Sequence, residues 1–108
     1  MQTKQALAAL AALAQESRLA TYRLLVQAGP QGMSPGKISE ALGIPASSLS
    51  FHLKELSHAQ LIVARQEGRF ILYAADFPTM SGLIGFLSEN CCEGNPCIAN
   101  PVCAGEAA

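Results

Sequence analysis

Apolar residues recur every three or four positions along much of this chain, the spacing that gathers them on one face of an α-helix. The first stretch predicts an amphipathic helix over about residues 3–14, built largely from Ala and Leu, which are strong helix formers. A second helix is predicted over about residues 17–28, where a glycine–proline pair ends it. The expected inward faces of these two helices comprise Leu7, Leu10, Ala11 and Ala14 in the first, and Leu19, Tyr22, Leu25 and Val26 in the second.

Two shorter helical patterns follow, separated by only three residues. The first begins at Ser34, a capping hydroxyl followed by proline, and ends at Gly43. The second starts after Pro45, and its buried face is expected to hold leucines at i, i+4 and i+7, namely Leu49, Leu53 and Leu56. Two helices joined by a short turn that contains glycine predict a helix-turn-helix.

The pattern then changes to β-rich runs, over residues 61–67 and 70–75, around the turn Glu67-Gly68-Arg69. This predicts a hairpin with a tight glycine turn. A last helix is expected over about residues 78–89, with Met80, Leu83, Ile84 and Leu87 on one face. The fold class is therefore mainly α with a β-hairpin wing (α+β), a winged helix-turn-helix. Because the first and last helices carry more apolar surface than a monomer needs, we expect a dimer through them.

Composition limits the function. The 108 residues are half apolar, enough for one core, and the formal net charge is −1, so any nucleic-acid contact must come from a local patch. There is no signal-peptide pattern and no apolar run near the roughly 20 residues that span a membrane. We therefore expect a cytoplasmic protein without a membrane partner, divided into a DNA-binding and dimerisation domain (1–89) and a cysteine-rich tail (90–108).

The outer face of the second short helix carries candidate DNA contacts. Counting 100° per residue places Ser47, Ser48, Phe51, Lys54 and Glu55 opposite the leucines. Hydroxyls in a first helical turn can donate to phosphates or base edges, and a helix N-terminus attracts phosphate. Phe51 fits apolar contact with a thymine methyl group, or packing against a neighbouring loop, and spacing alone leaves both open.

Two arginines, Arg65 and Arg69, flank the turn of the predicted wing. Their placement on a protruding hairpin fits a clamp on the phosphate backbone or the minor groove of DNA. An ordinary solvated hairpin would look similar. Only the presence of a predicted helix-turn-helix in the same chain favours the DNA interpretation.

All four cysteines, Cys91, Cys92, Cys97 and Cys103, lie within thirteen residues near the end of the chain. A cytosolic cluster of this kind favours metal binding or thiol chemistry, and thiolates select soft ions. The adjacent pair differs from the usual spacing of structural zinc sites, but a zinc site, a disulfide switch and an oxidation-sensitive end remain alternatives. A thiol redox enzyme would need an electropositive pocket, yet no Lys or Arg follows Arg69 and no hydrolase or phosphate-loop motif is present, so an enzyme is not expected.

Three segments together resemble the ArsR/SmtB metalloregulatory repressors. Residues 46–56 (ASSLSFHLKEL) resemble the recognition helix of that family, residues 66–73 (QEGRFILY) its wing, and residues 16–19 (ESRL) the start of its second helix. The resemblance covers roughly residues 5–88 and implies a homodimeric repressor that leaves double-stranded operator DNA when an inducer binds. It places the DNA contacts at Ser47, Ser48, Ser50, Phe51 and His52 on the recognition helix, with Arg65 and Arg69 on the wing.

The resemblance also suggests the inducer. Well-known arsenic-responsive members carry cysteines in the third helix, whereas residues 34–40 of this chain contain none. Some arsenic-responsive relatives instead place a cysteine pair after the last helix and a third cysteine a few residues on, which Cys91, Cys92 and Cys97 resemble. This implies arsenite or antimonite, As(III) or Sb(III), as inducer and no catalytic cofactor. Cys103 is a spare or a fourth ligand, and Cd, Pb, Bi or thiol oxidation is the alternative signal.

Overall fold

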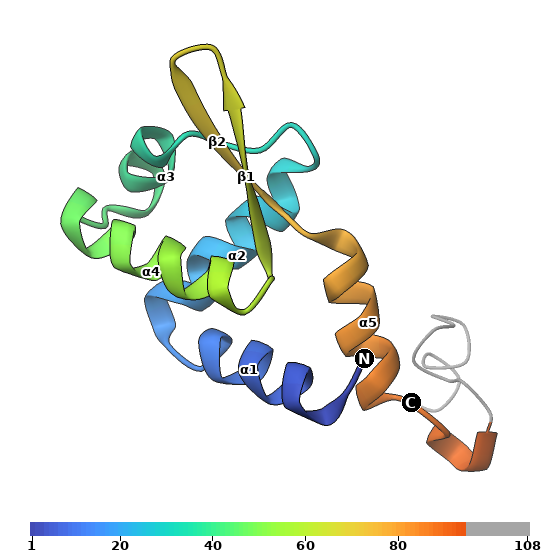
Figure 1. The fold of residues 1–108 in the computed structure, drawn as a ribbon. Helices are drawn as coiled ribbons and strands as arrows, with labels where there is room; N and C mark the ends of the chain where they lie inside the picture. The colour runs from blue at the N-terminus through green and yellow to red at the C-terminus, as the bar shows by residue number, and fades with distance from the viewer. Residues whose placement is uncertain (95–108) are drawn as a thin grey trace.

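The computed structural model describes residues 1–94 of the chain. In Figure 1 these residues form helices around a protruding two-stranded hairpin. The elements in order are α1 (Thr3–Leu13), α2 (Glu16–Ala28), α3 (Pro35–Leu42), α4 (Ala46–His58), β1 (Ile62–Glu67), β2 (Phe70–Ala75), α5 (Phe77–Leu87) and the 3-10 helix η1 (Cys91–Gly94). The predicted winged helix-turn-helix is confirmed, and each predicted helix or strand boundary lies close to the observed one.

Local chemistry explains where the helices begin and end. At α3 the Ser34 hydroxyl accepts a hydrogen bond from the Lys37 backbone N–H at 3.3 Å, and at α5 the Asp76 carboxylate accepts one from Thr79 at 3.1 Å. Gly43 ends α3 in the left-handed region, with φ at +66°, where glycine has no side chain to clash. The cap and the glycine thus fix both ends of the short helix α3.

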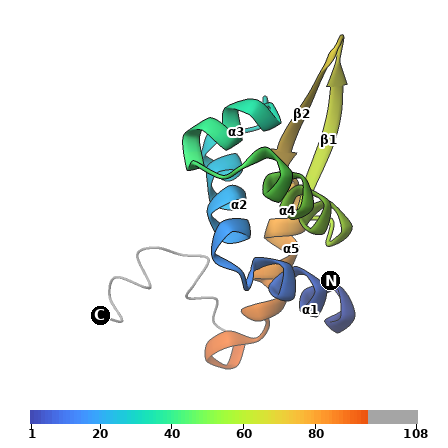
Figure 2. The same ribbon diagram turned by 90° about the vertical axis from the view of Figure 1, so that its left-hand side faces the viewer.

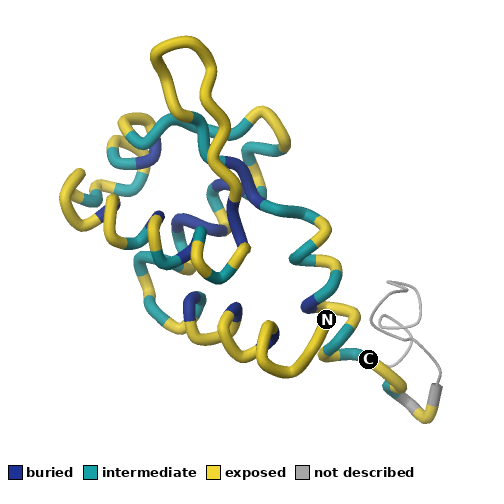
Figure 3. The backbone as a smooth tube through the Cα atoms, in the orientation of Figure 1, coloured by how far each residue is buried: buried dark blue, intermediate teal, exposed yellow. Residues whose placement is uncertain are grey.

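The core lies between α2, α3, α4 and the start of the hairpin. Leu25, Ile38, Leu49, Leu56 and Leu61 come from these elements and are almost completely enclosed. Figure 3 shows the buried backbone gathered at this centre, while the hairpin turn is exposed. The prediction that α4 buries its i, i+4, i+7 leucines is confirmed.

The hairpin is a regular antiparallel pair, running from Ile62 opposite Ala75 to Glu67 opposite Phe70. It extends well beyond the helices in both views (Figures 1 and 2). On its β2 side it is tied to the loop between α2 and α3, because Met33 and Tyr73 exchange two backbone hydrogen bonds of 2.8 Å. The base of the wing is therefore fixed to the loop that precedes α3.

The terminal helices differ from the prediction in the faces they bury. In α1 the inward residues are Ala6, Ala9 and Ala12, whereas Leu7 is 61% exposed. The expected inward face around Leu7 and Leu10 was wrong, because small alanines let α1 approach α2 and α4 closely and the larger leucines point away. Leu19 of α2, also expected inside, is 43% exposed.

Helix α5 shows the same division. Leu83 is buried and Met80 half-buried, but Ile84 and Leu87 of the predicted apolar face are exposed. Figure 1 shows α1 and α5 meeting at the end of the molecule away from the wing. Both helices therefore present large apolar side chains to the outside. Within residues 1–94, no helix has the length and apolar character to cross a membrane.

Candidate nucleic-acid interface

The first turn of α4 projects from the helix-turn-helix with its polar side chains outward. The turn before it is held by the Ser39 hydroxyl, which donates to the Ile44 carbonyl and so links α3 to the segment that leads into α4. Pro45 occupies the N-cap and offers no side-chain acceptor. Because no side chain caps them, the first N–H groups of α4 are available to an anion. The side chains exposed along this outer face are Ser47, Ser48, Ser50, Phe51 and Lys54.

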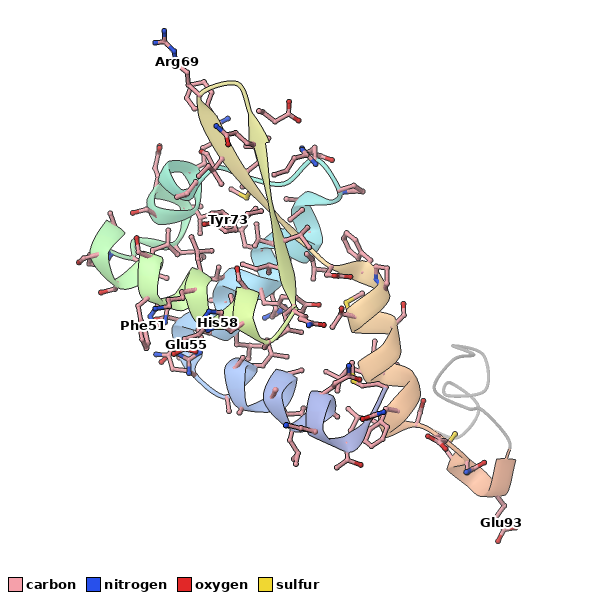
Figure 4. The ribbon with its side chains drawn as sticks, viewed as in Figure 1. Phe51, Glu55, His58, Arg69, Tyr73 and Glu93 are labelled. Atoms are coloured by element: carbon pink, nitrogen blue, oxygen red, sulfur yellow. The ribbon has the colours of Figure 1, made fainter. Side chains whose placement is uncertain are left out.

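Phe51 is the large apolar residue of this face. It is 54% exposed and meets the His52 ring edge-on, with the ring centroids 5.9 Å apart. Figure 4 shows it projecting from α4 on the same side as Glu55 and His58. Of the two interpretations of Phe51, packing beneath a loop does not fit this exposure. Contact with a base methyl group remains a prediction.

His52 lies at the edge of this face and is half-buried. Its Nδ1 atom is enclosed and has no hydrogen-bond partner among the described residues. The predicted contact of His52 with DNA stays a prediction.

The two wing arginines have different surroundings. Arg69 lies at the hairpin tip, exposed and directed away from the body (Figure 4). The Arg65 guanidinium instead donates from Nη1 and Nη2 to the carbonyls of Pro30 and Gln31, at 3.3 and 2.9 Å, and from Nε to Glu67 at 2.9 Å. Arg69 is thus placed as the predicted clamp would require, whereas Arg65 has intramolecular partners.

Sequence reasoning missed these partners of Arg65. The signal lay in the Gly-Pro-Gln-Gly run at 29–32, whose two glycines have φ at +86° and +73°. A Cβ on Gly32 would come within 2.5 Å of the Tyr73 carbonyl oxygen. Glycine is thus needed where this loop touches the wing.

The predicted thiol site is only partly within the described residues. Cys91 opens η1 directly after α5, is half-buried, and its backbone N–H donates to the Ser88 carbonyl at 3.0 Å. Cys92 follows it in η1, while Cys97 and Cys103 lie outside the described residues. Among the side chains that the structure describes, which do not include that of Cys92, no three of Cys, His, Asp or Glu are grouped to hold a metal ion. The three-thiolate site therefore stays a prediction.

One buried polar group was also missed. Tyr22 of α2 is almost fully enclosed, and its hydroxyl has no hydrogen-bond partner among the described residues. Burial raises the pKa of Tyr22, and the nearby Asp76 carboxylate raises it further. The hydroxyl of α2 therefore lies close enough to the cap of α5 to sense its charge, without a hydrogen bond between them among the described residues. Sequence spacing predicted only that Tyr22 faces inward.

Comparison with known proteins shows which class of protein the chain resembles. A family model described as a helix-turn-helix domain matches residues 13–65. A homodimeric winged helix-turn-helix DNA-binding domain from Mycobacterium bovis, of a possible ArsR-family regulator, is 26% identical; the match covers 85% of each chain with a TM-score of 0.63. The chain thus contains a helix-turn-helix domain and resembles winged helix-turn-helix regulators of the ArsR type.

Two further solved structures resemble this chain. An ArsR-like transcriptional regulator from Rhodococcus sp. has a TM-score of 0.74 over 96% of this chain and 92% of its own, but at 20% identity it speaks to the fold alone. A possible transcriptional regulator for arsenical resistance is 26% identical, with a TM-score of 0.62 over 84% of this chain and 93% of its own. No curated protein is significantly similar in sequence. The solved structures named here are those of transcriptional regulators and not of enzymes.

Proposed function

We propose that this regulator is a homodimeric repressor that binds operator DNA through α4 and the wing. Arsenite or antimonite, bound by thiolates at the end of the chain, releases it. The DNA-binding part of the proposal rests on the contrast between the buried and the exposed face of α4. Its leucines close the core, while Ser47, Ser48 and Phe51 stand exposed in its first two turns. A helix so divided can enter a major groove without disturbing the fold.

The exposed outer face of α4 combines positioning and reading. The N–H groups and serine hydroxyls of its first turn suit phosphate oxygens, which fix register without reading sequence. Phe51 supplies an apolar surface for a thymine methyl, and Lys54 supplies charge. Arg69 stands at the wing tip (Figure 4), where it would contact a second stretch of the DNA backbone. The local placement of these groups suits a chain whose net charge is only −1.

The exposed apolar side chains of α1 and α5 support pairing of two copies. Leu7, Leu10, Ile84 and Leu87 are all partly open to solvent in one copy. Each is about half exposed, so burying the remaining surface would contribute about 0.75–1.5 kcal/mol per side chain, half of the value for full burial. The Mycobacterium bovis domain that this chain resembles is itself homodimeric. A dimer would present two recognition helices to half-sites about one DNA turn apart.

The inducer half rests on the chemistry of the cysteines. Three thiolates suit As(III) or Sb(III), which are soft and bind sulfur in preference to oxygen. Cys91 follows α5 after only three residues, so ion binding there would act on the end of a helix that we place in the dimer interface. Coupling between two sites is typically about 1–3 kcal/mol, and near-complete release needs about 5 kcal/mol, so two coupled sites per dimer are required.

The test is fluorescence anisotropy of the reduced protein on a labelled duplex that the wild type has selected from a random library. We expect arsenite and antimonite to release the duplex, and zinc to leave it bound. Cys91→Ser, Cys92→Ser and Cys97→Ser should each bind DNA as the wild type does but lose the response. Cys103→Ser is the matched control and should respond unless that thiol is a ligand.

The outcomes separate the parts of the proposal. Release by cadmium or lead alone would keep the thiol site and change its ion. Release by peroxide but by no ion would replace ion sensing with thiol oxidation. A wild type that selects no duplex would contradict the DNA-binding half itself.

A further inference from the structure

Arg65 joins the wing to the loop that leads into the helix-turn-helix. It projects from β1, and its three nitrogens each have an acceptor within 3.3 Å. Two acceptors are the carbonyls of Pro30 and Gln31, more than thirty positions away in sequence, and the third is the Glu67 carboxylate on the same strand. The planar guanidinium thus spans two separate segments of the chain.

The loop is shaped to receive it. Gly29 and Gly32, on either side of the two carbonyls, both adopt positive φ. Directly beyond them Met33 exchanges two hydrogen bonds with Tyr73 of β2. The loop therefore meets the hairpin at two places, through Arg65 on β1 and through Tyr73 on β2.

The same interactions make Arg65 a poor phosphate ligand. Of the five N–H groups of a guanidinium, three are already donated within the protein. The acceptors around it are a carboxylate and two carbonyls, so an approaching phosphate would meet negative charge and partial negative charge. Arg69 has no such neighbours among the hydrogen bonds of the described residues and stands at the tip.

We infer that Arg65 is a positioning residue that holds the wing at a fixed angle to α3 and α4, while Arg69 binds the phosphate backbone. This rests on the DNA binding proposed above. Its consequence is that the recognition helix and the wing meet DNA as one rigid unit. The side chain is 45% exposed and its ion pair with Glu67 alone would contribute little, so the positioning depends on the two loop carbonyls.

The substitution Arg65→Lys distinguishes a phosphate ligand from a positioning residue. A lysine at this position keeps the positive charge but has no planar fork to bridge two carbonyls. If Arg65 served as a phosphate ligand, Arg65→Lys would retain most of the affinity. If it holds the loop, Arg65→Lys should fail almost as fully as Arg65→Gln.

The first experiment uses the free protein and needs no DNA. In Arg65→Lys and Arg65→Gln, hydrogen exchange at the Met33 and Tyr73 amides should be faster by roughly tenfold, the loss expected for about one net hydrogen bond. The Leu53 and Leu56 amides in α4 should be unchanged, which excludes general destabilisation. Unchanged exchange at Met33 and Tyr73 would overturn the inference.

The second experiment measures affinity for the selected duplex over a range of salt concentrations. Arg65→Lys and Arg65→Gln should both bind roughly tenfold more weakly, with the wild-type dependence on salt. Arg69→Gln should make the negative slope of log K against log salt shallower, by about 0.9 for each phosphate that the arginine neutralised. Full affinity in Arg65→Lys, with a shallower slope in Arg65→Gln, would overturn the inference and make Arg65 a phosphate ligand.

The two experiments also separate this inference from the proposed function. If the wild type selects no duplex, the proposed function fails, and the exchange of the free protein still decides whether Arg65 holds the wing.

Discussion

The middle of the chain and its two terminal helices use apolar residues in opposite ways. Most large apolar side chains of α2, α3 and α4 point inward, and Leu25, Ile38 and Leu56 are completely enclosed. Helices α1 and α5 direct leucine and isoleucine outward, and α1 packs inward through alanine. One copy therefore completes the core of its helix-turn-helix but leaves its terminal helices half covered. The difference indicates that the ends are built to meet another surface.

The largest effect should come from the middle of the chain. Leu56→Ala removes a fully enclosed side chain between α4 and its neighbours, and we expect a loss of about 2–5 kcal/mol in the free energy of unfolding. Urea denaturation at one fixed protein concentration measures it. Leu19→Ala, at a 43% exposed leucine of α2, is the matched control and should cost no more than about 0.5 kcal/mol. Equal losses in the two variants would contradict the division between core and surface.

The next effect should appear at the ends. Leu87 is 60% exposed in one copy, and Leu87→Glu would place two charges in the proposed interface. Losing the burial of its exposed part costs about 1 kcal/mol in each copy, which weakens the dimer by roughly thirtyfold, and burying the two charges adds to this. Sedimentation velocity over a range of concentrations gives the dissociation constant. Leu19→Glu, which adds the same charge outside the terminal helices, should leave it unchanged, and a Leu87→Glu protein that stays dimeric would place the interface elsewhere.

A smaller effect is expected on the exposed face of α4. Phe51→Ala should leave the unfolding temperature nearly unchanged, because more than half of the side chain already faces solvent. It should weaken binding to the selected duplex by roughly tenfold, since a methyl-sized apolar contact contributes about 0.8 kcal/mol and a dimer makes it twice. Anisotropy measures this. Unaltered affinity would remove Phe51 from the interface.

The smallest effect concerns the buried hydroxyl of Tyr22. Because this group has no hydrogen-bond partner among the described residues, Tyr22→Phe should change stability near neutral pH by no more than about 1 kcal/mol. The folded-state pKa lies above the ordinary value of 10.0, so the contribution of Tyr22 is complete below pH 10 and is lost as the pH rises through the folded-state pKa. Thermal unfolding should show wild type weakening against Tyr22→Phe at alkaline pH. Parallel curves would contradict the raised pKa.

The sequence predicted the middle of the molecule better than its ends for a physical reason. In α4, leucines recur every three or four positions among mostly polar residues, so they define a single face that can be buried. In α1, alanine and leucine surround the helix almost completely, and periodicity cannot tell whether Leu7 or Ala6 faces inward. Close approach to α2 and α4 selects alanine, and that approach is a tertiary contact which the local pattern does not contain.

In the candidate site, too, local periodicity predicted some features, while others depend on tertiary contacts. The exposure of Ser47, Ser48 and Phe51 followed from counting around a helix. The partners of Arg65 did not, because they lie more than thirty positions away and are backbone carbonyls, whose direction depends on the two loop glycines. Residue type identified Arg65 and Arg69 as cations. Only the fold separates the arginine that holds the wing from the one at its tip.

The most direct test of the central claim, that two copies together complete the terminal helices, is the molar mass of the reduced protein in solution by light scattering. One chain has a mass of 11.3 kDa. We predict twice that mass for the wild type, falling toward the single-chain value in Leu87→Glu. A wild type that keeps the mass of one chain across micromolar concentrations would contradict the claim, and the exposed leucines would then need another partner.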